Sequence, residues 1–274
     1  MASDLPLVID ERGPKRGSGD EPIVVFVHGS LDRAASFARV VRRLVDLPTV
    51  TYDRRGYDRS LPAGPGQSTL DGHVDDLLSV IDDRPAVVIG HSLGGVIALA
   101  AALRLQGAAP LVSVAAFEPP LPWLREANSR SPRSTDQQVA KPLSADVADE
   151  PGVIAERFFR RMVGDSAWDR LPEATRLARR ADGPALVADL ASVRITEAPF
   201  DVTRLTVPLV LGRGTNSLPH HRDAVEWLIE HTVGSELIEI DGAGHGAHLT
   251  HPDAFAGFVR ATVQRATQKA GSSA

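Results

Sequence analysis

Short apolar runs alternate with amphipathic stretches along much of the chain. The clearest runs, 23–27, 86–90 and 111–117, are apolar with almost no polar alternation. Such runs predict strands that are buried on both faces, as in a parallel sheet. In chain order, the expected strands are 23–27, 49–52, 86–90, 111–117, 207–212 and 237–240.

Helical periodicity fills the intervals between these strands. In one such interval Phe37, Val40 and Leu44 share a face, and arginines occupy the opposite face. Strands that alternate with helices predict an α/β fold class, with a mostly parallel sheet flanked by helices. The expected helices are 37–47, 70–82, 93–105 and one that starts near Pro252, a residue suited to a first helical turn.

The regular alternation breaks between residues 119 and 206. This segment is helical in pattern, is interrupted by prolines and is polar from 125 to 149. It is too helical for a loop and too short for an independent domain. We therefore expect one α/β core formed by residues 1–118 and 207–274, with residues 119–206 inserted as a helical cap.

Composition and charge exclude several classes of protein. The chain has no cysteine, which rules out disulfides, thiolate metal sites and a cysteine nucleophile. Its net charge of −5 predicts no nucleic-acid or membrane partner. No apolar run approaches the roughly 18 residues of a membrane span, and residues 1–19 lack an apolar signal region. We therefore expect a cytoplasmic protein, monomeric or homodimeric.

The segment Gly90-His91-Ser92-Leu93-Gly94 matches the G-x-S-x-G pattern of a nucleophile elbow. It lies directly between an expected strand and an expected helix, where a tight turn projects a serine hydroxyl from the sheet edge. The glycines leave room where the strand and helix backbones approach each other. The start of the helix adds free amide donors. Ser92 is therefore the predicted nucleophile.

Three further motifs accompany the elbow: His28-Gly29-Ser30, Asp53-Arg54-Arg55-Gly56 and Gly242-Ala243-Gly244-His245. With them, the chain resembles the capped, esterase-like serine hydrolases of the α/β-hydrolase superfamily over roughly residues 22–266. The resemblance implies that His245 is the general base, with His248 as the alternative. It also implies that the backbone amides of Ser30 and Leu93 form the oxyanion hole. The Asp53–Gly56 loop is expected to be structural.

The third member of the triad departs from the usual pattern of this family. The acid commonly follows the strand expected at 207–212, but the next residues here, as far as Ser217, contain no carboxylate. Some members take the acid from the end of the preceding strand, where Glu118 lies beside the ligand crevice. We assign Glu118 as the partner of His245. Asp223 lies on an expected helix, and Asn216 or no acid at all stay open as alternatives.

Candidates for substrate contacts come from the elbow and from the aromatic residues of the insertion. Most of these aromatic residues are expected to form the core of the cap. Cap side chains also face the nucleophile in this architecture, so His91, Trp123 and Phe159 are predicted to bind substrate.

No metal or cofactor is predicted. The sequence contains no phosphate loop or dinucleotide fingerprint. The late histidines match no metal-ligand spacing: His220, His221, His245, His248 and His251.

The expected function is hydrolysis of a small or medium carboxylic ester, in which Ser92 forms an acyl-enzyme. The expected partner is therefore a small-molecule substrate. Carbon–carbon bond hydrolysis, a lyase reaction and cofactor-free perhydrolysis would use the same serine and histidine with a different pocket. A non-catalytic ligand-binding homologue is the alternative from another class. Intact Ser92 and His245 weigh against it, whereas the missing acid near Asn216 weighs for it.

Overall fold

The computed structural model describes residues 7–14, 21–64, 69–106, 108, 110–124, 149–193 and 198–272. A seven-stranded sheet runs through this part of the chain in the order β1-β3-β2-β4-β5-β6-β7. β1 pairs antiparallel with β3, and every other pair in the sheet is parallel. The strands are β1 (Ile9–Arg12), β2 (Ile23–Val27), β3 (Thr49–Tyr52), β4 (Ala86–His91), β5 (Leu111–Phe117), β6 (Leu209–Gly214) and β7 (Glu236–Ile240).

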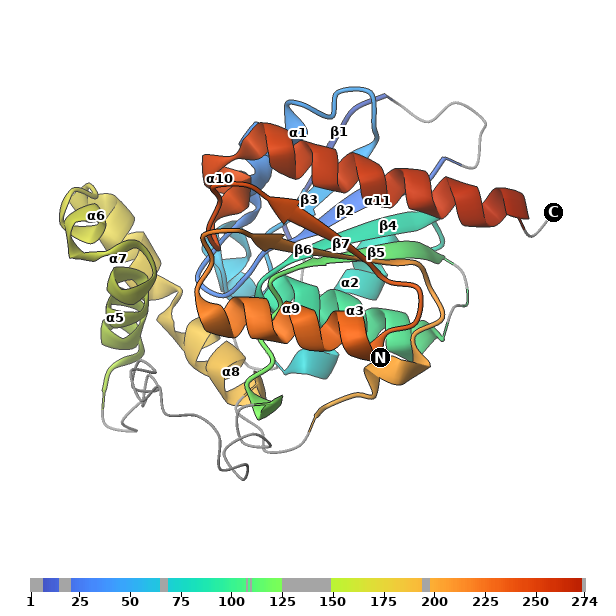
Figure 1. Ribbon diagram of the computed structural model, residues 1–274. Coiled ribbons are helices and arrows are strands. Elements are labelled where there is room, and N and C mark those ends of the chain that lie inside the picture. Colours follow the sequence, from blue (N-terminus) through green and yellow to red (C-terminus); the bar gives the residue numbers. More distant parts are fainter. Residues whose placement is uncertain are drawn as a thin grey trace, which may run out of the picture.

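Helices cover both faces of the sheet (Figure 1): α1 and α11 lie on one face, and α2, α3 and α9 lie on the other. The α-helices of the core are α1 (Ala38–Val41), α2 (Leu70–Ile81), α3 (Leu93–Leu105), α9 (Pro219–His231), α10 (Ala247–Thr250) and α11 (Pro252–Ser272). Short 3-10 turns are η1 (Ala34–Phe37), η2 (Asp58–Ala63) and η3 (Val202–Arg204). This arrangement confirms the expected α/β-hydrolase fold. Among the described helices, none is long and apolar enough to cross a membrane.

The two faces of the sheet carry separate apolar cores, which explains the uniformly apolar strand sequences. Alternate residues of β2 belong to different cores: Val25 packs with α2 and α3, whereas Val24 and Phe26 pack with α1 and α11. Every residue of β2 and β4 is buried. A strand with two buried faces has no solvent side on which polar residues would alternate.

The helix expected at 37–47 is shorter in the structure. Its α-helical part ends at Val41, and the N–H groups of Arg43 and Leu44 bond three residues back rather than four. Pro48 follows closely, and a proline disfavours helical backbone in the residue before it. The segment therefore tightens into turns before β3.

Four helices lie between β5 and β6, within the segment predicted as a cap. They are α5 (Pro151–Val163), α6 (Asp165–Asp169), α7 (Glu173–Ala181) and α8 (Gly183–Val193), here called the helical insert. In Figure 1 they lie to the left of the sheet, beside the end where α10 also lies. Apolar side chains of α5 and α8 pack with Leu31 and Tyr57 of the core loops. Residues 125–148 and 194–197 of the predicted cap lie outside the described part.

The close contact between β4, α3 and β2 depends on two glycines. A Cβ atom on Gly94 would lie 2.0 Å from the carbonyl oxygen of Val27, and one on Gly90 would lie 2.2 Å from the carbonyl oxygen of Gly94. Both contacts are with backbone, which cannot move aside as a flexible side chain can. The glycines of the elbow therefore set how closely α3 approaches the sheet.

We expect Gly94→Ala to lower the free energy of unfolding by about 1–3 kcal/mol or more, because the added methyl group forces backbone apart. Urea denaturation measures the change. Gly257→Ala on α11 is the matched control, since its Cβ meets no described atom within 4 Å. That control should be neutral or stabilising by up to about 1 kcal/mol. Equal effects at both positions would contradict this account.

Candidate active site

The strand-to-helix turn at Ser92 has the geometry of a nucleophile elbow. Ser92 follows β4, the central strand of the sheet, and directly precedes α3. Its backbone has φ 54° and ψ −126°, a conformation that is costly for any residue but glycine. The Ser92 N–H donates to the carbonyl oxygen of Phe117 at 2.9 Å, which ties the turn to the end of β5. The side chain is half-buried.

The loop His28-Gly29-Ser30 lies directly against this turn. A Cβ atom on Gly29 would lie 2.9 Å from the Cβ atom of Ser92. Leu93 is the first residue of α3, where a backbone N–H has no acceptor within the helix. The two segments predicted to supply oxyanion donors, at Ser30 and Leu93, thus flank Ser92.

Glu118 and His245 meet at the end of β5. Nδ1 of His245 lies 2.8 Å from Oε2 of Glu118. The Glu118 carboxylate is completely buried, and its other oxygen accepts hydrogen bonds from the N–H of Gly214 at 2.8 Å and from the hydroxyl of Ser217. These donors fix the carboxylate, which in turn fixes the orientation of the imidazole.

The other candidates for the acid lie elsewhere. The Asn216 side chain donates to the carbonyl oxygen of Gly242 at 3.1 Å, so it holds the turn before His245 rather than the imidazole. Asp223 is exposed on α9. Among these three side chains, Glu118 is the one that the structure places on Nδ1 of His245.

His91 is buried behind the elbow and contacts the loop of His245. Its Nε2 lies 2.7 Å from the carbonyl oxygen of His245, and the two ring centroids are 4.7 Å apart. The alternative base, His248, also packs against His91, with ring centroids 4.2 Å apart, and its Nε2 lies 3.3 Å from a carboxylate oxygen of Asp32. His221 on α9 stacks on His245, with ring centroids 4.0 Å apart and planes 10° apart.

The two aromatic residues predicted to contact substrate both pack within the protein. Trp123 is buried and meets Phe200 edge to face. Phe159 lies on α5, where it packs against Trp168 with the guanidinium of Arg179 over its ring. Their contact with a substrate stays a prediction.

Comparison with known proteins identifies the family of the chain. Residues 24–258 match the model of the "Alpha/beta hydrolase family". The chain belongs to this family. A curated relative, the uncharacterized hydrolase YraK of Bacillus subtilis, is 43% identical over 94 residues, which is 32% of this chain and 34% of that protein.

Two further relatives of the family extend the comparison. The pimeloyl-[acyl-carrier protein] methyl ester esterase of Aromatoleum aromaticum is 28% identical over 215 residues, covering 70% of this chain and 82% of that protein. A thermophilic esterase from Thermogutta terrifontis has the same fold, with a TM-score of 0.69, 21% identity and 95% and 93% of the two chains covered. For three of the curated relatives, the aligned part covers only 34%, 41% and 56% of the relative's length.

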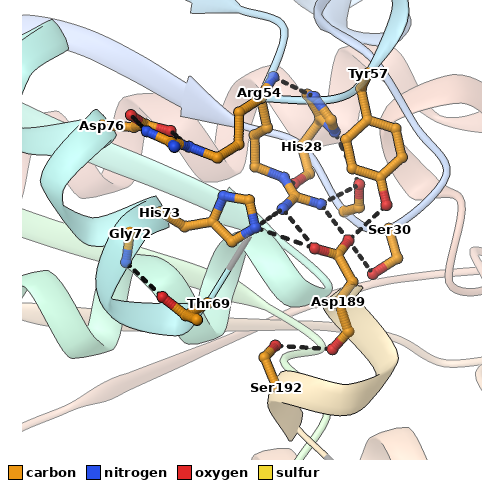
Figure 2. Close-up of polar contacts among 12 residues, drawn as sticks. His28, Ser30, Arg54, Tyr57, Thr69, Gly72, His73, Asp76, Asp189 and Ser192 are labelled. Carbon is orange, nitrogen blue, oxygen red and sulfur yellow. Dashed lines mark hydrogen bonds and ion pairs between the residues drawn. The ribbon is translucent and has the colours of Figure 1, made fainter. Parts of the chain in front are cut away.

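A buried polar cluster beside the elbow was not predicted from the sequence (Figure 2). Asp189 of α8 lies at its centre and is bonded to Ser30, Arg54, Tyr57 and His73. Only a carboxylate in an otherwise apolar stretch, Gly183–Val193, hints at it in the sequence. Its partners are more than 100 residues away along the chain, so the sequence pattern does not reveal them.

Two groups in the described part bring three metal-capable atoms within 4.8 Å of one another: Asp32, His91 and His248, and Glu118, His221 and His245. In each group the carboxylate already faces an imidazole, at 3.3 Å and 2.8 Å respectively. The second group includes the predicted general base. These contacts account for the carboxylates without a metal ion.

Three buried histidines near the site are held in the neutral form. Burial, together with the charge on Arg54, lowers the pKa of His28 to about 3. Burial also lowers the pKa of His73, and it lowers that of His91 well below the usual range. The neutral form of His28 fits its contacts, because Nε2 accepts from the Arg54 N–H while Nδ1 donates to the Gly29 carbonyl.

We expect the stability of the protein to fall as the pH drops below about 6.5, the ordinary histidine pKa. In that range His28, His73 and His91 are protonated in the unfolded chain but stay neutral in the folded protein. Each group contributes at most about 1.4 kcal/mol per pH unit, a slope approached only well below about pH 6.5, where the unfolded chain is almost fully protonated. Urea denaturation between about pH 5 and 7 measures the slope. His28→Asn should reduce the slope, and a flat profile would refute the assignment.

Proposed function

We propose that the protein is a serine hydrolase that cleaves small or medium carboxylic esters through an acyl-enzyme. The observation that carries the proposal is the contact of His245 with the buried carboxylate of Glu118, beside an elbow that carries Ser92. A nucleophile, a base and a group that orients the base are the parts this chemistry needs.

In the proposed reaction, the Ser92 hydroxyl attacks the ester carbonyl as Nε2 of His245 takes its proton. Glu118 accepts a hydrogen bond from Nδ1 and stabilises the imidazolium that forms. The backbone N–H groups of Ser30 and Leu93 hold the oxyanion. His245 then returns the proton to the departing alcohol, and a water molecule activated by the same imidazole releases the acid from Ser92.

The comparisons support chemistry at an acyl group. The relative that aligns with this chain over 82% of its own length is named a methyl ester esterase, and another relative is named a probable thioesterase. Carbon–carbon bond hydrolysis, a lyase reaction and perhydrolysis would engage the same residues. A panel of p-nitrophenyl esters with graded acyl lengths, assayed with and without hydrogen peroxide, separates ester hydrolysis from perhydrolysis by whether the product is the acid or the peracid.

The first test is labelling with a fluorophosphonate probe, which phosphonylates an activated serine. We expect one mole of label per mole of protein, lost in Ser92→Ala and strongly slowed in His245→Ala. His248→Ala, the matched control on the alternative base, should label at a rate within about threefold of the unmodified protein. Absence of label on the unmodified, folded protein would overturn the proposal and favour a non-catalytic ligand binder.

Glu118→Gln tests the acid directly. The amide keeps the size of the side chain but neither stabilises the imidazolium nor enforces the correct tautomer, so we expect kcat on p-nitrophenyl acetate to fall by about 10- to 10⁴-fold. The matched control is Asp223→Asn on the exposed face of α9, with an expected change within about twofold. If Glu118→Gln left kcat unchanged, the carboxylate would have no part in the reaction.

A further inference from the structure

The helical insert contributes one completely buried carboxylate to the core of the protein. Asp189 on α8 has no exposed surface. Figure 2 shows its two oxygens surrounded by donors from three separate segments. Oδ2 accepts from the hydroxyl of Ser30 at 2.9 Å and from the hydroxyl of Tyr57 at 2.6 Å. Both oxygens accept from the guanidinium of Arg54, at 3.0 and 2.7 Å.

This cluster is electrically balanced. Burial alone would raise the pKa of Asp189, but the charge of Arg54 and hydrogen bonds from His73 and Arg54 hold it well below its usual range. Burial also opposes the charge on Arg54, yet the attraction of Asp189 raises the pKa of Arg54 above its usual value. One anion and one cation therefore share a fully buried site, and His73 beside them is neutral.

Arg54, which is held by Asp189, also bonds to the loop His28–Ser30 beside Ser92. Its Nε donates to the carbonyl oxygen of His28 at 3.0 Å, and a terminal nitrogen donates to the carbonyl oxygen of Gly29 at 3.1 Å. The Gly29 carbonyl and the Ser30 N–H belong to one planar peptide unit and point in opposite directions. Fixing the Gly29 oxygen therefore fixes the direction of the Ser30 N–H.

Two further residues of the insert region bond to the same loop, at Leu31 and Arg33. Arg179 of α7 donates to the carbonyl oxygen of Leu31 at 2.9 Å, and Asp182, between α7 and α8, pairs with Arg33 at 3.1 Å. Leu31 itself has φ 55°, a conformation that needs support from its surroundings. The loop 28–33 is thus held from the insert at three residues, Ser30, Leu31 and Arg33.

We propose that Asp189 is a positioning residue for the oxyanion hole. Through the hydroxyl of Ser30 and through Arg54, it orients the peptide that carries the Ser30 N–H toward the oxygen that becomes negative in the transition state. The inference rests on the proposed function, in which that amide binds the oxyanion. It makes the helical insert a part of the catalytic geometry in addition to any contact that the insert makes with substrate.

The test compares two variants of this cluster with a matched control. Ser30→Ala removes one hydrogen bond to Asp189 and keeps the backbone amide. Asp189→Asn removes the charge that holds Arg54. The control, Asp76→Asn, breaks the other buried arginine–aspartate pair of the same loop, Arg55 with Asp76, for which no contact with loop 28–30 is described. Each variant is assayed for kcat, KM and melting temperature.

A transition-state analogue separates positioning from general loss of structure. A trifluoromethyl ketone forms a tetrahedral adduct with Ser92 whose oxyanion occupies the hole, so its Ki reports the donors directly. For Asp189→Asn we expect kcat to fall about 100-fold, Ki to rise by a similar factor and KM to change by less than about threefold. For Ser30→Ala we expect a smaller loss in kcat, about three- to tenfold, at a nearly unchanged melting temperature.

Asp76→Asn should lower the melting temperature while kcat and Ki stay within about threefold of the unmodified protein. The inference is overturned if Ser30→Ala and Asp189→Asn lose only thermal stability, with kcat and Ki unchanged. If Asp189→Asn does not fold, Ser30→Ala decides alone, with unchanged kcat and Ki as the negative result. A failure of the proposed function looks different, because then the unmodified protein itself neither hydrolyses esters nor takes the fluorophosphonate label.

Discussion

A carboxylate with no contact to solvent must have its oxygens hydrogen-bonded by the protein itself. Glu118 meets this condition with donors from three segments: the end of β6 at Gly214, the turn at Ser217 and the loop of His245. Its own N–H bonds back to Gly212. The Glu118 side chain therefore connects the ends of β5 and β6 with the loop of His245. These contacts fix the relative positions of the three segments at the site.

Asp189 meets the same condition on the other side of the elbow. Glu118 holds the imidazole, and Asp189 holds the loop that contains Ser30. The two carboxylates come from different parts of the chain, one from the sheet and one from the helical insert. Ser92 lies on a strained turn after β4, which runs between β2 and β5, so the groups on either side of the proposed nucleophile are fixed before any substrate binds. Such preorganisation is what electrostatic stabilisation of a transition state requires.

The parts that could be predicted from the sequence are those encoded by local pattern. β2, β3, β5 and α3 match their expected ranges because continuous apolar runs and helical periodicity report burial directly. β1 was missed: Ile9–Arg12 is a largely exposed edge strand with three charged residues in four. Glu118 could be proposed because it directly follows a recognisable strand. Asp189 could not, because its role depends on Arg54, 135 positions away in the chain.

The buried pair also constrains how this site can change. Replacing Arg54 or Asp189 alone leaves an uncompensated buried charge, which costs far more than losing an exposed pair. Replacing both with apolar residues could restore stability, since a well-packed apolar pair often matches a buried ion pair. Such a double replacement would still remove the donors to the carbonyls of His28 and Gly29. Stability alone therefore does not account for a charged pair at this position, whereas the orientation of the loop beside Ser92 does.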